Sequence, residues 1–224
     1  MENIVVCDFD GTITKVDCIN DFLDRFADEK WLDFEQDWID GKISTCEAMQ
    51  SQFALIKDMT EQKISDFFNS VQIDKYFKTF YELSKKNNLK VVIVSDGFEY
   101  FVRQVLERNE IFGIEIYSNS LKFKNGKFEM TFPYMNSLCK RKAGTCKCNF
   151  IRNFKKLYKN VYYIGDGVSD YCPAEKVDYL FAKSKLLKYC KERNIPHLEY
   201  TTFHEVINSE IFRFNNWWGV IRKR

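Results

Sequence analysis

The sequence contains very little histidine and no long apolar run. Its two histidines, His197 and His204, lie late in the chain among polar neighbours, so a histidine-based nucleophilic triad is not expected. The longest apolar stretches, such as Val91–Val94 and Val161–Ile164, are far shorter than the roughly 20 residues that cross a bilayer. We therefore expect neither a membrane span nor a signal peptide.

A strong excess of charge is also lacking. The formal net charge of the 224 residues is +2, so no global field would draw the protein to nucleic acid. The short basic tail Arg222–Arg224 is interpreted as a solvated end. Eight cysteines without an export signal predict reduced thiols and a cytoplasmic protein, because disulfide frameworks are typical of smaller exported domains.

Short β-branched runs alternate with stretches of helical spacing. The runs have the length of buried parallel strands, and they are Ile4–Cys7, Val91–Val94, Val161–Ile164 and, as a fourth candidate, Tyr179–Ala182. Helical spacing follows the second run in residues 98–106, and it precedes the third in residues 150–157. This alternation predicts the α/β class, with a doubly wound, mostly parallel sheet and a Rossmann-like core.

The interval between the first two runs is too long for a simple crossover. Its pattern predicts five helices, at Ile19–Phe26, Trp31–Ile39, Thr45–Ile56, Thr60–Val71 and Tyr76–Asn87. We assign residues 15–75 to a helical cap inserted into an α/β core made of residues 1–14 and 76–224. Alternation within residues 113–133, around Asn125-Gly126, predicts a β-hairpin.

Polar residues follow each of the first three strand runs. Asp8 and Asp10 follow the first run, Ser95-Asp96-Gly97 follows the second, and Asp166 and Asp170 follow the third. In open α/β sheets ligands bind outside the carboxyl ends of the strands, so these residues are expected to share one site.

Four carboxylates at one sheet edge would repel one another unless a cation lies among them. Oxygen ligands from a few residues are what Mg²⁺ accepts, so the pattern predicts a metal site formed by Asp8, Asp10, Asp166 and Asp170. Side chains two residues apart on an extended segment point the same way. Asp8 can therefore act as a nucleophile and metal ligand, while Asp10 transfers protons.

Carboxylates can attack phosphorus and form an aspartyl phosphate that is later hydrolysed. The phosphoryl oxygens then need donors and a cation, which Ser95 and the amides after it, at the start of a helix, would supply together with Lys147. A phosphate ester leaves as an alkoxide that needs a proton, so an acid at position 10 favours phosphomonoester hydrolysis.

The motifs "DFDGT", "VSDG", Lys147 and "GDGVSD", in this order, resemble those of the haloacid dehalogenase superfamily. The resemblance implies that Asp8 is the nucleophile, Asp10 the acid and base, and Ser95 and Lys147 the phosphate binders. It implies Mg²⁺ ligation by Asp166, Asp8 and the Asp10 carbonyl, while Asp170 holds a metal-bound water or orients Lys147.

The helical insert resembles the cap of the phosphoserine phosphatase branch. That branch carries a Glu and an Arg that grip the amino acid; the corresponding positions here are Asp17 and, further on, Gln52 and Phe53. Because the Arg is missing, phosphoserine loses its expected partner. Asp17 is kept as a candidate substrate-binding residue.

Two substrate classes therefore stay open, besides phosphoserine. "GTCKC" and the segment after the last strand run resemble the subgroup of 2-hydroxy-3-keto-5-methylthiopentenyl-1-phosphate phosphatases, which is the leading candidate. Asp96 and Tyr171–Pro173 are more similar to phosphocholine/phosphoethanolamine phosphatases. Asp96 and Gly97 are expected to bind phosphate through their backbone amides, provided that the Asp96 carboxylate points outward.

Some alternatives compete with a small-metabolite phosphatase. A phospho-accepting receiver needs no inserted cap, and an inactive binding module would have lost one of the motif residues.

Zinc could be bound by Cys139, Cys146, Cys148 and Cys172, although the spacing matches no common site. Aromatic residues of the insert, Trp38 among them, are expected in its core or facing substrate. Trp217-Trp218 are expected to dock the last helix or to form an interface, as in a homodimer.

Overall fold

The computed structural model describes residues 2–210 and 212. They form a seven-stranded sheet of order β4-β3-β2-β1-β5-β6-β7. The strands are β1 (Ile4–Cys7), β2 (Lys90–Phe98), β3 (Glu115–Lys124), β4 (Lys127–Thr131), β5 (Val161–Gly165), β6 (Tyr179–Ala182) and β7 (Leu198–Glu199). All neighbours pair in parallel except β3 and β4. The predicted α/β class with a mostly parallel sheet is confirmed.

The predicted helices are confirmed with small shifts at their ends. They are α1 (Cys18–Phe26), α2 (Trp31–Ile39), α3 (Thr45–Ala54), α4 (Glu61–Ser70), α5 (Phe77–Lys86), α6 (Glu99–Arg108) and α7 (Lys147–Leu157). In the described part of the chain, the structure adds three helices that the sequence pattern does not predict, α8 (Tyr171–Ala174), α9 (Ser184–Arg193) and α10 (Phe203–Asn208). Capping explains several starts, since Ser44 and Glu47 form a capping box on α3 and Thr60 caps α4.

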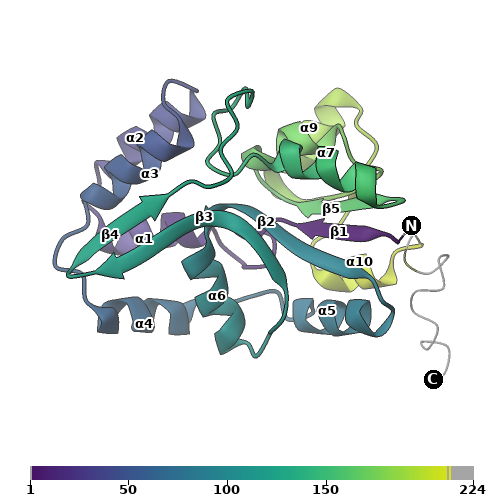
Figure 1. Cartoon of the computed structure of the whole chain (residues 1–224), viewed down its shortest axis with the longest axis horizontal. Helices are drawn as coiled ribbons and strands as arrows, with labels where there is room; N and C mark the ends of the chain where they lie inside the picture. The colour runs from purple at the N-terminus through teal and green to yellow at the C-terminus, as the bar shows by residue number, and fades with distance from the viewer. Residues whose placement is uncertain (1, 211, 213–224) are drawn as a thin grey trace.

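Helices cover both faces of the sheet. Val5 and Cys7 of β1 face one apolar cluster and Ile4 and Val6 face the other, as side-chain alternation along a strand requires. Figure 1 shows α7 and α9 on one side of the sheet, and α5, α6 and α10 on the other. β1 is therefore fully buried and holds the start of the first motif in the middle of the fold.

Helices α1 to α4, which we call the helical insert (residues 18–70), follow β1. Phe22 of α1 and Phe53 of α3 contact Phe128 of β4 with ring centroids 6.0 and 5.2 Å apart, and Phe22 also lies against Phe101 of α6. The hairpin and α6 thus anchor the insert beside the sheet edge (Figure 1). The cap boundaries at residues 15 and 75 stay a prediction.

The hairpin turn lies where the sequence predicts it. Asn125 and Gly126 have φ angles of 52° and 75°, the left-handed values that a two-residue hairpin turn of this kind requires.

The cysteines differ from the sequence expectation. Cys148 on α7 and Cys172 on α8 are joined in a disulfide, so the prediction of reduced thiols throughout is wrong for this pair. Cys139 and Cys146 are free. Within residues 2–210 and 212, no group of three or more potential metal ligands includes a cysteine, so the zinc alternative is not formed.

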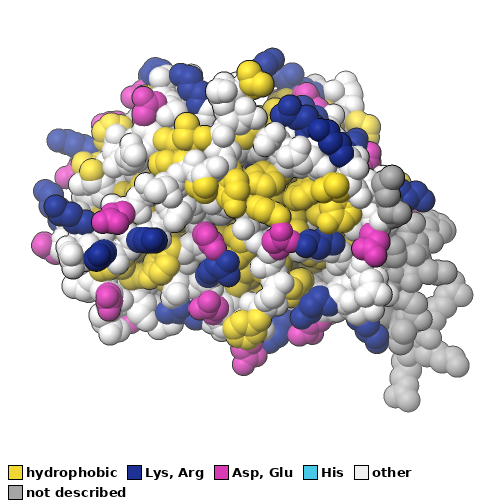
Figure 2. Space-filling view, viewed as in Figure 1, with side chains coloured by type: hydrophobic (Ala, Val, Ile, Leu, Met, Phe, Trp, Pro, Cys, Tyr) yellow, Lys and Arg dark blue, Asp and Glu magenta, His cyan; other side chains and the backbone are white. Residues whose placement is uncertain are grey.

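Two further features concern the surface and the chain end. On the face shown in Figure 2, cationic and anionic side chains are interspersed around a central band of hydrophobic ones. Among the described helices, none is long and apolar enough to cross a membrane. Trp217, Trp218 and the tail Arg222–Arg224 lie outside the described residues, so the homodimer expectation is not tested.

Candidate active site

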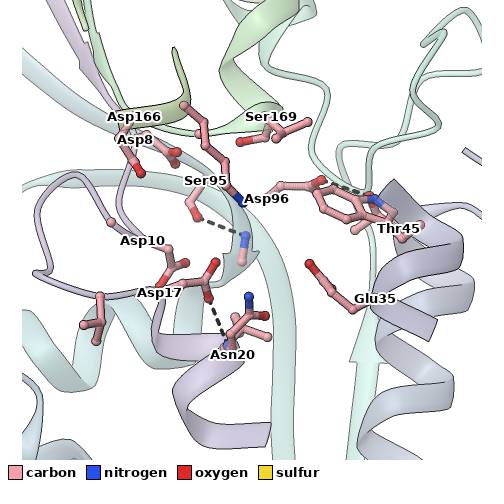
Figure 3. Close-up of a pocket in the computed structure, with 18 of the residues that line it drawn as sticks. Asp8, Asp10, Asp17, Asn20, Glu35, Thr45, Ser95, Asp96, Asp166 and Ser169 are labelled. Carbon is pink, nitrogen blue, oxygen red and sulfur yellow. Dashed lines mark hydrogen bonds between the residues drawn. The ribbon is translucent and has the colours of Figure 1, made fainter. Parts of the chain in front are cut away.

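The carboxyl ends of three central strands meet at one pocket. Cys7 of β1 lies opposite Ile93 of β2 and Ile164 of β5, so the polar residues that follow come together. They line a cavity of about 340 Å³, whose walls include Asp8, Asp10, Asp17, Ser95, Asp96, Gly97 and Asp166. Figure 3 shows the side chains of Asp8, Asp10, Asp17, Ser95, Asp96 and Asp166 around the cavity. Helices α1, α2 and α3 supply another wall of the same cavity.

Asp8 is 5% exposed and is held through one oxygen. Its Oδ1 accepts hydrogen bonds from the Phe9 amide at 2.8 Å and pairs with Lys147 Nζ at 2.8 Å. No hydrogen bond joins Asp8 Oδ2 to another group of the described chain, so this oxygen is available to a ligand. Burial, with the nearby charge of Asp170 added to it, raises the pKa of Asp8.

Asp166 lies beside Asp8 after β5. Its Oδ1 accepts a hydrogen bond from Thr12 Oγ1 at 2.7 Å, and burial together with Asp170 raises its pKa to about 6. Gly11 makes room for this carboxylate, because a Cβ there would lie 2.5 Å from Asp166 Oδ2. Gly11 also has a φ of 73°, which other residues rarely adopt.

Oxygen atoms of Asp8, Asp166 and Asp170 lie within 4.8 Å of one another. Lys147 is the only basic residue paired with them in the described chain, so the cluster keeps an excess of negative charge. An oxygen-only donor set with excess negative charge suits Mg²⁺. The residues therefore fit the cation that the sequence predicts.

Asp170 is fully buried, and both of its oxygens are engaged. Oδ1 accepts from Lys147 Nζ at 2.7 Å and Tyr163 OH at 2.5 Å, and Oδ2 accepts from the amides of Asp166 and Gly167. Burial alone would raise its pKa, but Lys147 and these hydrogen bonds hold the pKa of Asp170 below its usual value. Asp170 thus orients Lys147 and the loop that carries Asp166.

Lys147 begins α7 and is 4% exposed. Burial alone would lower the pKa of Lys147, but Asp170 and Asp8 outweigh it and raise the value. The ammonium also donates to Ser169 Oγ at 2.8 Å. It is therefore a fixed positive charge beside Asp8, as phosphate binding needs.

Asp10 points away from the acidic cluster. Its Oδ1 accepts from the Cys18 amide at 3.0 Å, and a Cβ on Gly97 would lie 2.6 Å from its Oδ2. Burial and the neighbouring Asp17 raise its pKa to about 8. The Asp10 carboxylate does not join the group of three possible metal ligands, and its protonated form is suited to donating a proton.

Ser95 is 1% exposed and its Oγ accepts from the Gly97 amide at 2.9 Å (Figure 3). The expectation of a helix start beside Ser95 is wrong, because β2 continues through Phe98 and α6 begins at Glu99. Donors at this edge therefore belong to an extended segment, without a helix N-terminus next to Ser95.

The Asp96 carboxylate links the core to the helical insert. Oδ1 accepts from the Thr145 amide at 2.7 Å and from Asn119 Nδ2 at 3.3 Å, and Oδ2 accepts from Thr45 Oγ1 at 3.0 Å. Thr45 is the first residue of α3 and accepts in turn from Trp38 Nε1 at 3.0 Å. With its oxygens held by these donors, the Asp96 carboxylate is directed to the insert and the loop before α7.

Asp17 caps α1 by accepting from the Asn20 amide at 2.9 Å and lines the pocket (Figure 3). Gln52 also lines the pocket, whereas Phe53 is buried among aromatic rings. The sequence reading missed Glu35, which points into the pocket from α2 (Figure 3). Glu35 lies on the same helix face as Trp31 and Trp38. An acid within such an apolar stripe is the sequence signal that could have identified Glu35 as a pocket residue.

Comparison with known proteins places the chain among hydrolases. The family of haloacid dehalogenase-like hydrolases matches residues 5–175. A curated 2-hydroxy-3-keto-5-methylthiopentenyl-1-phosphate phosphatase of Geobacillus thermodenitrificans is 30% identical over 207 residues, covering 92% of this chain and 94% of that protein. A curated protein of the same name from Bacillus pumilus is 34% identical over 206 residues, covering 89% of this chain and 87% of that protein.

Solved structures share the fold. A structure described as a phospho-aspartyl intermediate analogue of phosphoserine phosphatase matches with a TM-score of 0.69 at 19% identity, covering 92% of this chain and 98% of that chain. A phosphoserine phosphatase from T. onnurineus matches with a TM-score of 0.67 at 18% identity, covering 93% and 94%. At these identities the likeness shows the fold alone.

Proposed function

We propose that the chain hydrolyses a small phosphate monoester through an aspartyl phosphate on Asp8. The proposal starts from the family, because the chain belongs to the haloacid dehalogenase-like hydrolases and is a phosphatase. The observation that carries this proposal is the arrangement of Asp8. Lys147 and the Phe9 amide hold Oδ1, while Oδ2 is left for attack.

In the proposed first step Asp8 Oδ2 attacks phosphorus, and the bond from phosphorus to the leaving oxygen breaks. Asp10, protonated because of its raised pKa, gives its proton to that oxygen. In the second step a water attacks the phosphorus of the aspartyl phosphate and loses its proton to the Asp10 carboxylate, while the bond between phosphorus and Asp8 Oδ2 breaks and restores the Asp8 carboxylate. Inorganic phosphate leaves, and both aspartates return to their first state.

The phosphoryl oxygens would be bound by Lys147, Ser95 and the Asp96 amide, while the Gly97 amide, which already donates to Ser95 Oγ, would hold that hydroxyl in place. Asp8 and Asp166, with the Asp10 carbonyl, would hold Mg²⁺, which supplies charge stabilisation for the phosphoryl group. Asp170 has its oxygens engaged by protein donors, so we assign it to positioning Lys147 and the Asp166 loop.

The leading substrate is 2-hydroxy-3-keto-5-methylthiopentenyl-1-phosphate, the compound in the names of the curated relatives. The insert wall suits its thioether tail, because Trp38 and Met49 both line the pocket. This substrate would place the protein in methionine salvage.

A second candidate is a phosphocholine or phosphoethanolamine. Glu35, Asp17 and the Trp38 ring on the same pocket wall would suit a cationic leaving group. Phosphoserine is less well supported. Among the described pocket residues, those from α1, α2 and α3 include no Lys or Arg that would pair with a substrate carboxylate.

A phosphate-release screen with Mg²⁺ tests the proposal and ranks the substrates. The panel contains the methylthiopentenyl phosphate, phosphocholine, phosphoethanolamine and phosphoserine. We expect the first compound to give the highest kcat/KM. Highest activity on the two amines would favour the second candidate, and a flat profile would indicate a general scavenging phosphatase.

A further inference from the structure

Glu35 and Gln52 form a polar pair on the insert wall of the pocket. Gln52 is 2% exposed, and its Nε2 donates to Glu35 Oε2 at 3.1 Å. Because the amide is buried and the acceptor is on the neighbouring helix, the pair fixes the direction of the Glu35 side chain. Oε1 accepts no hydrogen bond from any residue in the described part of the chain.

The pair lies across the cavity from the reacting groups. Figure 3 shows the Glu35 side chain pointing into the pocket from α2, on the side opposite Asp8 and Asp10. A phosphate held at Asp8 would therefore direct its leaving group towards Glu35. Among the described residues, Glu35 is the one carboxylate that α2 and α3 contribute to the cavity lining.

The charges that face Glu35 come from two other elements. Asp17, the cap residue of α1, adds a second negative charge, and Lys185 of α9 adds a positive one. Asp17 and Lys185 are both exposed, whereas Glu35 is half-buried, so solvent screens the charges of Asp17 and Lys185 more strongly than that of Glu35. The inner part of this wall is consequently negative.

We propose that Glu35 selects substrates by the charge of the leaving group. It rejects phosphate monoesters whose leaving group carries a carboxylate and admits neutral or cationic ones, to which Oε1 can accept a hydrogen bond. This inference rests on the proposed phosphatase function. It names Glu35 as a specificity residue that takes no part in the chemical step.

Coulomb repulsion between Glu35 and a substrate carboxylate determines how much the affinity for such a substrate falls. Two unit charges about 6 Å apart, with an effective dielectric between about 20 and 40, interact strongly enough to change affinity by about tenfold to a hundredfold. A hydrogen bond from a hydroxyl or ammonium group to Oε1 would act in the opposite direction and widen the difference.

The test uses two esters that differ in one group. Glycerol 3-phosphate carries a hydroxymethyl group where 3-phosphoglycerate carries a carboxylate. The kcat/KM of each is measured with Mg²⁺ for the wild type and for Glu35→Gln, Glu35→Asp and Asp33→Asn. Asp33 is an exposed acid on the same helix that does not line the pocket, so it controls for a general loss of charge.

The wild type should prefer glycerol 3-phosphate, and Glu35→Gln should reduce that preference by about tenfold, mainly by lowering KM for 3-phosphoglycerate. Gln keeps the hydrogen bond with Gln52, so the side chain should stay in place, and Asp33→Asn should leave kcat for the neutral ester within about threefold of the wild type. Glu35→Asp and Asp33→Asn should keep the preference.

Two results would overturn the inference and can be told apart. The first result is a wild type that hydrolyses glycerol 3-phosphate without preferring it to 3-phosphoglycerate, or a Glu35→Gln variant that keeps the wild-type preference. Either outcome would show that Glu35 does not select by charge. If the wild type hydrolyses no phosphate ester at all, the proposed function fails together with the inference.

Discussion

Replacing Asp170 by asparagine should destabilise the fold and impair the reaction together. Asp170 is fully buried and accepts four hydrogen bonds, two at each oxygen, from Lys147, Tyr163 and the amides of Asp166 and Gly167. An asparagine amide group must face one of these pairs of donors. Whichever way the side chain turns, two donors lose their acceptor.

The size of the effect follows from these contacts. A hydrogen bond involving a charged group contributes about 1.5 to 3 kcal/mol, so two lost bonds remove about 3 to 6 kcal/mol. Less repulsion with Asp8 and Asp166 offsets part of this loss, and Asp8 still pairs with Lys147. We expect a net loss of about 3 kcal/mol, or a melting temperature lower by roughly 6 to 12 °C in a chain of this length.

Thermal and urea unfolding in EDTA measure this difference, and phosphate release with Mg²⁺ measures the loss of activity. Ser169→Ala is the matched control, because it removes a single hydrogen bond to the same Lys147 ammonium and leaves Asp170 in place, so it should cost about half as much, about 1.5 kcal/mol. An Asp170→Asn protein that melts within about 2 °C of the wild type and keeps full activity would refute this account of Asp170.

Two other predictions concern the cation and the insert. EDTA should abolish phosphate release and Mg²⁺ should restore it, because the cluster of Asp8, Asp166 and Asp170 keeps an excess of negative charge; full activity in EDTA would contradict the metal proposal. Thr45→Val should lower the free energy of unfolding by about 1 to 3 kcal/mol, since Asp96 and Trp38 each lose a partner; an unchanged urea midpoint would show that this link carries no stability.

The residues at the carboxyl edge of the sheet can be predicted from the sequence, because each motif there directly follows an apolar run. Asp8, Ser95 and Asp166 each follow an apolar run, and parallel pairing alone brings the ends of such runs together. The hairpin at Asn125-Gly126 is predictable for a similar reason, since its turn requires residues that tolerate positive φ.

Contacts between distant segments could not be predicted in the same way. Asp96 meets Thr45 across 51 positions of sequence, and Gln52 reaches Glu35 on another helix. Helical periodicity places each residue on a face of its own helix, but it does not say which faces meet. The pairing of Cys148 with Cys172 is hidden for the same reason, because it depends on how α7 and α8 pack.

The end of β2 shows a different limit. Ser95-Asp96-Gly97 has the composition of a turn, and a helix is expected to start beside it. The strand instead continues to Phe98, since β3 still pairs with β2 there and Phe98 is buried. Tertiary pairing overrides the local turn preference at this point.

Phosphate release by the Asp8→Asn variant tests the central claim most directly. The measurement compares the variant with the wild type on the best substrate of the screen, with Mg²⁺ present and folding checked by thermal unfolding. If Asp8 forms the aspartyl phosphate, the variant should lose about 10⁴-fold or more in kcat, because an amide oxygen cannot replace the attacking carboxylate. Full activity in Asp8→Asn would contradict the covalent mechanism.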